Sequence, residues 1–306
     1  MGRADSILAA LETTDVALLG RVVDVQSQGD AERASVRVME TLRGAPLHER
    51  IAVRAGARAL LEGDAHFTAG ETVLLLASRA NGEFELPAGL RPVKVTLANA
   101  AQRDEARALV RGYLDGVSGA AGQGALDALL RRSVATGNPR LRAGVQEDLS
   151  HRLNAADAPF LCGLAEQSGA LEDVRVFAIR GLAGLADPVP APLADLLRPV
   201  EPVAIRQAVI DAFAAHGARD VVERGLADPS EEVRKTAVDN LAAPDAVALL
   251  ERHFARESAL GVRLAIVRQL GLIGTDASRG ALRRILAASS DAAIHRAGEP
   301  WLDAER

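Results

Sequence analysis

Arginine recurs at one position of a repeated nine-residue window, and its spacing is the first feature of this 306-residue sequence that suggests chemistry. The guanidinium is always charged and binds phosphate or carboxylate through two parallel hydrogen bonds. A row of such groups could hold a phosphate chain, or it could bridge to acidic residues of the same protein. The arginine is second in the window, at Arg142, Arg175, Arg206, Arg234 and Arg263, with His295 in the sixth copy.

The seventh position of the window carries a second set of charges. It lies off the apolar side of the predicted helix and should point to the inner, concave surface of a helical array. Three acids and two bases favour a protein or peptide partner over a polyanion, although a merely solvated surface would have the same pattern. The predicted partner-binding residues are Glu147, Arg180, Asp211, Asp239 and Arg268.

Motifs for catalysis are missing from the sequence. The histidines are scattered along the sequence. His48-Glu49 is a single His-Glu dipeptide with no second such pair, so no metal site is predicted. The sequence contains no Gly-Lys-Ser/Thr phosphate loop and no Gly-x-Ser-x-Gly elbow. Cys162 is the only cysteine and lies in an apolar stretch, where a small buried residue is expected. We therefore predict a non-enzymatic protein with no catalytic residues, no metal and no cofactor.

The window itself predicts an amphipathic helix. Its first, fifth and ninth residues fall on one side of a 3.6-residue helix, and nearly all of them are apolar. A helical pattern with a period of roughly thirty residues indicates a helical solenoid, here an α-α superhelix of about six helix pairs. The copies are 141–149, 174–182, 205–213, 233–241, 262–270 and, in degraded form, 294–302.

This frame resembles the second helix of HEAT repeats, including the HEAT-like subtype first described in phycobilisome lyases. The resemblance implies that the repeated arginine bridges neighbouring repeats, and Asp173, Asp228 and Glu257 precede three windows as candidate acceptors. We therefore interpret the arginines as a structural ladder. The last copy, with Gly298 and Pro300-Trp301, is interpreted as a C-terminal cap in which Trp301 covers the core.

The first hundred residues predict a different fold. Runs rich in β-branched residues at 16–25 and 34–42 flank a turn with Gly29 and form a hairpin, and further strands are expected at 50–55, 72–79, 83–86 and 93–96. Asn81-Gly82 is a hairpin signal, and Gly20 marks a bulge. Five or six short strands with a longer crossing between the third and fourth suggest an OB-like β-barrel.

The stretches Asp15 to Val22, Glu40 to Gly44 and Phe67 to Leu76 resemble bacterial domains related to the tissue inhibitors of metalloproteinases. That resemblance implies a fold more than an activity, because the zinc-chelating N-terminal cysteine of the animal inhibitors has no counterpart here. The predicted organisation is an OB-like barrel at 1–100, a linking helix and flexible junction at 101–122, and a HEAT-type solenoid at 123–306.

Composition limits the possible functions. The net charge is −5 and aromatic residues are 3%, which gives neither a basic surface nor stacking platforms for nucleic acid. Arginine greatly outnumbers lysine, which indicates high-GC bacterial coding. No signal peptide or membrane span is predicted, so a cytoplasmic location is expected, or a periplasmic or secreted one if a signal peptide was removed.

The sequence thus predicts a scaffold or adaptor that binds a protein or peptide on the concave solenoid surface. Nucleic-acid binding and a lyase-like accessory role on a cofactor-bearing protein remain as alternatives. Oligomeric state is not predicted.

Overall fold

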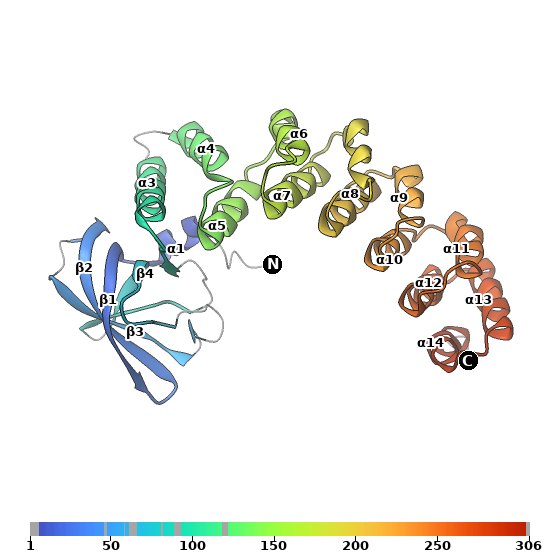
Figure 1. Ribbon diagram of the computed structural model, residues 1–306, viewed down its shortest axis with the longest axis horizontal. Coiled ribbons are helices and arrows are strands. Elements are labelled where there is room, and N and C mark those ends of the chain that lie inside the picture. Colours follow the sequence, from blue (N-terminus) through green and yellow to red (C-terminus); the bar gives the residue numbers. More distant parts are fainter. Residues whose placement is uncertain are drawn as a thin grey trace. The chain divides into compact units, whose positions relative to one another are not determined.

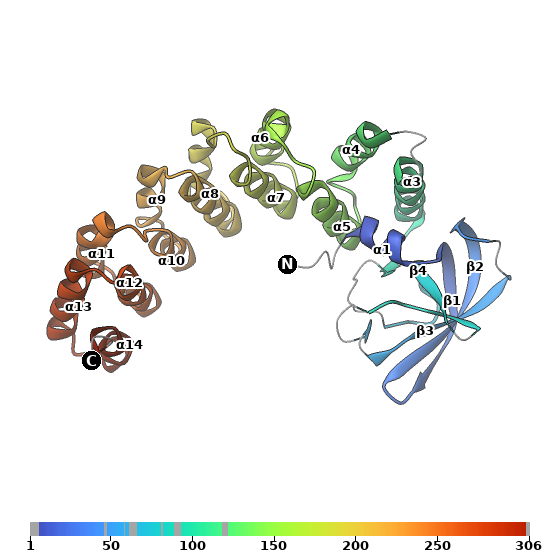
Figure 2. The ribbon, with the colours of Figure 1, turned by 180° about the vertical axis from the view of Figure 1, so that it is seen from behind.

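A computed structural model describes residues 6–45, 48–57, 59–60, 66–80, 82–88, 93–117 and 122–303. The chain divides into two compact units, Met1–Leu153 and Asn154–Arg306. The first contains a six-stranded sheet and several helices, and the second is helical throughout its described length. Figures 1 and 2 show the elements of each unit from opposite sides.

The sheet of the first unit follows the predicted strands closely. Its strands are β1 (Val16–Gln28), β2 (Ala31–Arg43), β3 (Arg50–Ala55), β4 (Thr72–Ala80), β5 (Glu83–Glu85) and β6 (Lys94–Thr96). The β1–β2 hairpin turns at Gly29, whose φ of 65° is a conformation that glycine adopts without strain. The pairing of β1 with β2 shifts register between Leu19 and Gly20, which confirms the predicted bulge.

The strand pairings form a ring. β1 pairs with β2, β2 with β3, β3 with β5, β5 with β4, and β4 again with β1, while β6 adds to the free side of β4. Only the β3–β5 pairing is parallel among these. Side chains that alternate towards the interior of the ring, such as Leu18, Val36, Val53 and Leu75, are buried and form its core. Asn81 of the predicted Asn81-Gly82 turn lies outside the described residues.

Helices α1 (Ile7–Thr13), α3 (Ala100–Val117), α4 (Gly122–Ser133) and α5 (Pro139–Ser150) complete the first unit. The carboxylate of Asp148 in α5 joins three of them. It accepts hydrogen bonds from the backbone N–H groups of Ile7 and Leu8 at 3.0 and 3.1 Å and from the hydroxyls of Ser6 and Tyr113. Burial raises the pKa of Asp148, although these donors act in the opposite direction.

The second unit consists of helices in two layers. The first layer contains α6 (Ala158–Glu166), η3 (Ala191–Leu197), α9 (Arg219–Gly225), α11 (Val247–Phe254) and α13 (Asp276–Ala288). The second layer contains α7 (Glu172–Ala183), α8 (Val203–Ala215), α10 (Glu231–Asp239), α12 (Leu260–Ile273) and α14 (Ala292–Asp303). Short helical turns η2 (Ala155–Asp157) and η4 (Pro244–Ala246) precede α6 and α11. The layers alternate along the chain, as a helical-repeat solenoid requires (Figure 1).

The repeated windows supply the second-layer helices, and their apolar positions form the core. In the copy at 233–241, Val233, Ala237 and Leu241 are all buried, as their one-sided helical spacing predicts. One predicted first helix differs from expectation, because the segment at Pro192–Leu197 is a 3₁₀-helix rather than an α-helix.

The degraded sixth copy forms a full helix, α14, the last one described. Pro300 lies inside α14, which continues to Asp303. A Cβ at Gly271 of α12 would collide with the indole of Trp301, so the glycine is what lets that ring lie against α12. Trp301 packs against the last core cluster.

The sequence predicted a junction at 101–122, and the two compact units meet at Leu153 and Asn154. Helix α3 stands where the linking helix was predicted, and residues 118–121 of the predicted flexible junction lie outside the described part of the chain. Helices α4 and α5, expected to open the solenoid, group with the sheet. The amide of Asn138 donates to the carbonyl of Thr96 after β6, and Asp148 holds α1, so α5 is joined to the sheet unit at both ends.

Candidate functional site

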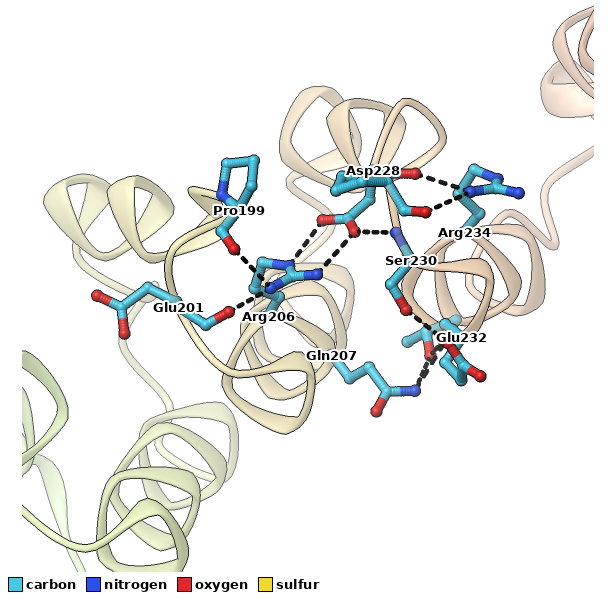
Figure 3. Close-up of polar contacts among 10 residues, drawn as sticks. Pro199, Glu201, Arg206, Gln207, Asp228, Ser230, Glu232 and Arg234 are labelled. Carbon is cyan, nitrogen blue, oxygen red and sulfur yellow. Dashed lines mark hydrogen bonds and ion pairs between the residues drawn. The ribbon is translucent and has the colours of Figure 1, made fainter.

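The buried ion pair of Arg206 and Asp228 is the best-formed polar site in the second unit (Figure 3). The guanidinium donates from Nε and Nη2 to the two carboxylate oxygens at 2.8 and 2.9 Å. The two side chains are 5% and 4% exposed. Asp228 also accepts from the backbone N–H of Ser230 at 2.8 Å, which fixes the turn before α10. Arg206 lies in α8, so this pair links two successive helix pairs.

The same arrangement recurs on either side. Arg175 of α7 donates to the carboxylate of Glu201 at 2.7 Å, and Arg234 of α10 donates to both oxygens of Glu257 at 2.8 and 3.0 Å. Each arginine also donates to a backbone carbonyl, which for Arg175 is that of Ala165 in α6 and for the other two lies in the turn before their own helix. Arg206 donates to the carbonyl of Glu201, and Arg234 donates to the carbonyl of Asp228 at 2.9 Å. The result is a continuous chain in which acids and arginines alternate from α7 to the turn before α12.

The remaining members of the arginine set differ. Arg142 of the first unit donates to the carbonyl of Thr136 at 2.8 Å. Arg263 has its guanidinium carbon 4.4 Å from the ring centroid of Phe254, and its buried Nε finds no acceptor among the described residues. The residue that corresponds to Asp228 and Glu257 before the next window is Ser289, which has no carboxylate. His295 contacts the carbonyl of Ser289 at 2.8 Å, in the manner of the arginines before it.

Position seven lies on the exposed side of the second-layer helices. Arg180, Asp211, Asp239 and Arg268 are exposed on α7, α8, α10 and α12. Arg268 forms an ion pair with Asp239, and Asp211 accepts from the amide of Asn240 at 2.8 Å. Glu147, the fifth predicted residue, belongs to α5 in the first unit, where it is half-buried and lies 3.2 Å from the imidazole of His151. We refer to the four residues of the second unit as the inner stripe.

Two titratable groups at the end of the arginine chain, Glu257 and His253, have lowered pKa values. Burial alone would raise the pKa of Glu257, but hydrogen bonds from the Arg234 guanidinium and the Ala259 N–H hold that pKa below its ordinary value. Burial lowers the pKa of the neighbouring His253, although its distance of 3.3 Å from Glu257 favours the charged imidazolium. The lowered pKa favours the neutral form of His253, and the carboxylate of Glu257 forms its ion pair with Arg234.

The sequence also raised the questions of a reactive cysteine, a metal site and a membrane-spanning helix. Cys162 lies half-buried in α6, and burial raises the pKa of its thiol. Within the described ranges, no three His, Cys, Asp or Glu side chains come together as a metal site. None of the helices described above has both the length and the apolar character that crossing a membrane requires.

The sequence analysis did not identify Glu201 as an acceptor, although this residue lies at nearly the same distance before its window as Asp228 and Glu257 do before theirs. Glu201 stands four residues before its window, whereas Asp228 and Glu257 stand five residues before theirs. Asp173, which was expected to accept from an arginine, accepts from the adjacent N–H of Val174 at 3.0 Å. A search for an acid in the turn before each window, rather than directly before it, would have found Glu201.

Comparisons with known proteins add limited information. No protein-family model matches the chain, and no curated protein matches it. One similar solved structure is the complex of CpcE and CpcF of phycocyanin lyase from Nostoc, with a TM-score of 0.34, 21% identity, and coverage of 68% of this chain and 90% of that chain. Two designed armadillo repeat proteins have TM-scores of 0.35 and 0.34 with 19% and 18% identity. Each covers 60% of this chain, and the matched regions are 92% and 94% of those proteins. One of the two was designed for modular peptide recognition.

Proposed function

We propose that this chain is a non-enzymatic binding protein that captures a protein or peptide segment on the inner stripe of its second unit. The observation that supports this most directly is the exposure of a charged residue at the same position of four successive second-layer helices, α7, α8, α10 and α12. Repetition at one helical position places these side chains along one surface, and a partner that follows the helix array would meet each of them in turn.

The charges of the inner stripe favour a protein partner. Both signs are present, with Arg180 and Arg268 on either side of Asp211 and Asp239, so a polyanion would meet two carboxylates. Arg268 and Asp239 already neutralise each other, and Asp211 is held by an amide. Arg180 is exposed and has no ion-pair partner among the described residues, so it is the residue best placed to receive a carboxylate from outside.

The arginine chain has a different proposed role. Arg206 and Arg234 are turned into the array, and internal acceptors occupy their donor groups. Arg175 donates to Ala165 and Glu201, and its buried Nη2 has no acceptor among the described residues. Because the Arg175 side chain is only 4% exposed, that donor is closed to a phosphate chain. We assign these arginines to holding successive repeats together, in the manner of the HEAT-type repeats that the sequence resembles. We also interpret the ring of strands in the first unit as an OB-like barrel, because its pairing order places β1 between β2 and β4 and closes the sheet.

Affinity capture with full-length protein tests the proposal. The test variant is Arg180→Glu combined with Asp211→Lys, which reverses two exposed charges without touching the arginine chain. The matched control is Glu172→Lys with Arg252→Glu, which makes the same changes at exposed positions outside the stripe. We expect the test variant to lose partners that wild type and control both retain, with unchanged circular dichroism. Equal recovery by all three proteins would refute the inner stripe as the binding surface.

A further inference from the structure

A row of three arginines crosses the outer surface of the sheet in the first unit. Arg21 of β1 lies opposite Arg37 of β2, and Arg37 lies opposite Arg50 of β3. Their neighbours Val22, Val36 and Ile51 are buried, so the arginines point away from the core, and all three are exposed. We call Arg21, Arg37 and Arg50 the arginine row.

The arginine row lacks the carboxylate partners that other arginines on this surface of the sheet have. Further along the same strands, Arg33 pairs with Glu83, and Arg54 lies 3.6 Å from Glu85. Both glutamates belong to β5, which is only three residues long and ends before it reaches the row. Within the described chain, none of the three row arginines has an ion-pair partner. Like charges directly opposite each other in a sheet are destabilising, so this arrangement has a cost that a bound anion would remove.

The surroundings of the row have the composition of a protein interface. Met39, two residues from Arg37 along β2, is 50% exposed, and Val23 beside Arg21 is 38% exposed. Arginine and methionine are enriched at protein interfaces, whereas nucleic-acid surfaces add aromatic side chains on which bases stack. The aromatic rings of this sheet unit do not serve that purpose, because Phe67 and Phe84 are both buried.

A hollow of about 250 Å³ adjoins the row and gives an acidic side chain a place to enter. Its lining includes the small residues Ser35 and Ala52, with Arg50 and Arg33 among the charged groups beside them. The hollow also has an acid, Asp24, whose carboxylate accepts from the amide of Gln26 at 3.2 Å. Across three strands the row spans about 10 Å, which exceeds what one carboxylate can cover.

We propose that the arginine row binds an acidic peptide segment that supplies at least two carboxylates. In an extended segment, alternate side chains lie about 7 Å apart on one side, so two glutamates separated by one residue fit the span of the row. Each carboxylate receives the planar, two-pronged donor set of a guanidinium. This surface belongs to the first unit and is distinct from the inner stripe, so the protein has a second docking surface that selects acidic segments.

Fluorescence polarisation on the full-length chain tests the assignment. The probe is a short labelled peptide with glutamate at alternate positions, compared with the same peptide carrying glutamine and with a labelled oligothymidylate of equal charge. The variant is Arg21→Gln/Arg37→Gln/Arg50→Gln. We expect wild type to prefer the glutamate peptide at low salt, and the variant to bind it about tenfold more weakly, as the loss of at least two exposed charge pairs implies.

A control and a second readout separate binding from folding and from net charge. The control is Arg252→Gln/Arg256→Gln/Arg283→Gln, which removes three exposed charges from the second unit. It should bind the glutamate peptide as wild type does. The row variant should melt at the same temperature as wild type or a higher one, because substitution relieves the cross-strand repulsion. The proposal is overturned if wild type ignores the glutamates, if it prefers oligothymidylate, or if the control weakens binding equally.

Discussion

Substitution of Asp228 by asparagine should destabilise the second unit far more than loss of an exposed ion pair. The Arg206 and Asp228 side chains are 5% and 4% exposed, and two hydrogen bonds of 2.8 and 2.9 Å join them. Asp228→Asn removes the negative charge while keeping the shape, which leaves a buried guanidinium without its counter-charge. Breaking a buried pair from one side costs about 3 to 5 kcal/mol.

The chain offers a matched control for this measurement. Arg284 donates to both carboxylate oxygens of Glu251 at 2.6 and 2.9 Å, so the geometry is equally bidentate, but the side chains are 63% and 30% exposed. Glu251→Gln should therefore cost less than about 1 kcal/mol. Urea unfolding of the full-length proteins, followed by circular dichroism, gives both values. Equal costs for Asp228→Asn and Glu251→Gln would refute the argument that burial gives the pair its importance.

A double variant distinguishes the charge from the volume of the pair. Arg206→Met with Asp228→Leu replaces two buried charges by apolar side chains of similar size, an exchange that is often neutral. We expect this double variant to recover most of the stability that Asp228→Asn loses. If it is as unstable as the sum of the single changes, the two residues act independently and the bridge contributes no coupling.

Three further predictions concern the C-terminal half of the array. Ser289→Glu should raise the unfolding midpoint by supplying an acceptor to the unpaired Nε of Arg263, whereas Ser289→Gln, which brings no charge, should gain less. Since the pKa of Glu257 is lowered in the folded protein, its ion pair stabilises above the ordinary value of 4.5 and is lost as pH falls through the lower folded pKa. The stability gap between wild type and Glu257→Gln should therefore shrink on acidification, and a gap that widens would contradict the assignment. Gly271→Ala should displace the indole of Trp301, which a shift of tryptophan emission would detect and an unchanged spectrum would disprove.

The helical array was predictable because its information is local. Apolar residues at positions one, five and nine of each window lie on one side of a helix by geometry alone, and residues such as Val233 and Ala237 are buried as that spacing requires. The hairpin of β1 and β2 was equally accessible, since a turn at Gly29 separates two β-branched runs. These features need no knowledge of contacts between distant segments.

The grouping of α5 with the sheet was not predictable from such patterns. Its contacts join residues far apart in sequence, as when Asp148 accepts from Ile7 and Tyr113, and a carboxylate at position eight of a window gives no local sign of these partners. The arginine row escaped notice for the same reason. Arg21, Arg37 and Arg50 become neighbours only through the register of three strands, and register depends on the turn, the bulge and the buried side chains together.

Arginine thus has three roles in this protein, and its surroundings decide between them. At position two of the window, the side chain is enclosed by the next turn and finds a carboxylate there, so exchange of Arg206 would damage the array itself. At position seven, about 140° further around the helix, Arg180 faces outwards and its exchange should leave stability almost unchanged. In the arginine row, like charges face one another and substitution should stabilise the sheet. A gain in stability on substitution would show that the row arginines do not hold the sheet together, whereas a loss at Arg206 would show that this arginine holds the array together.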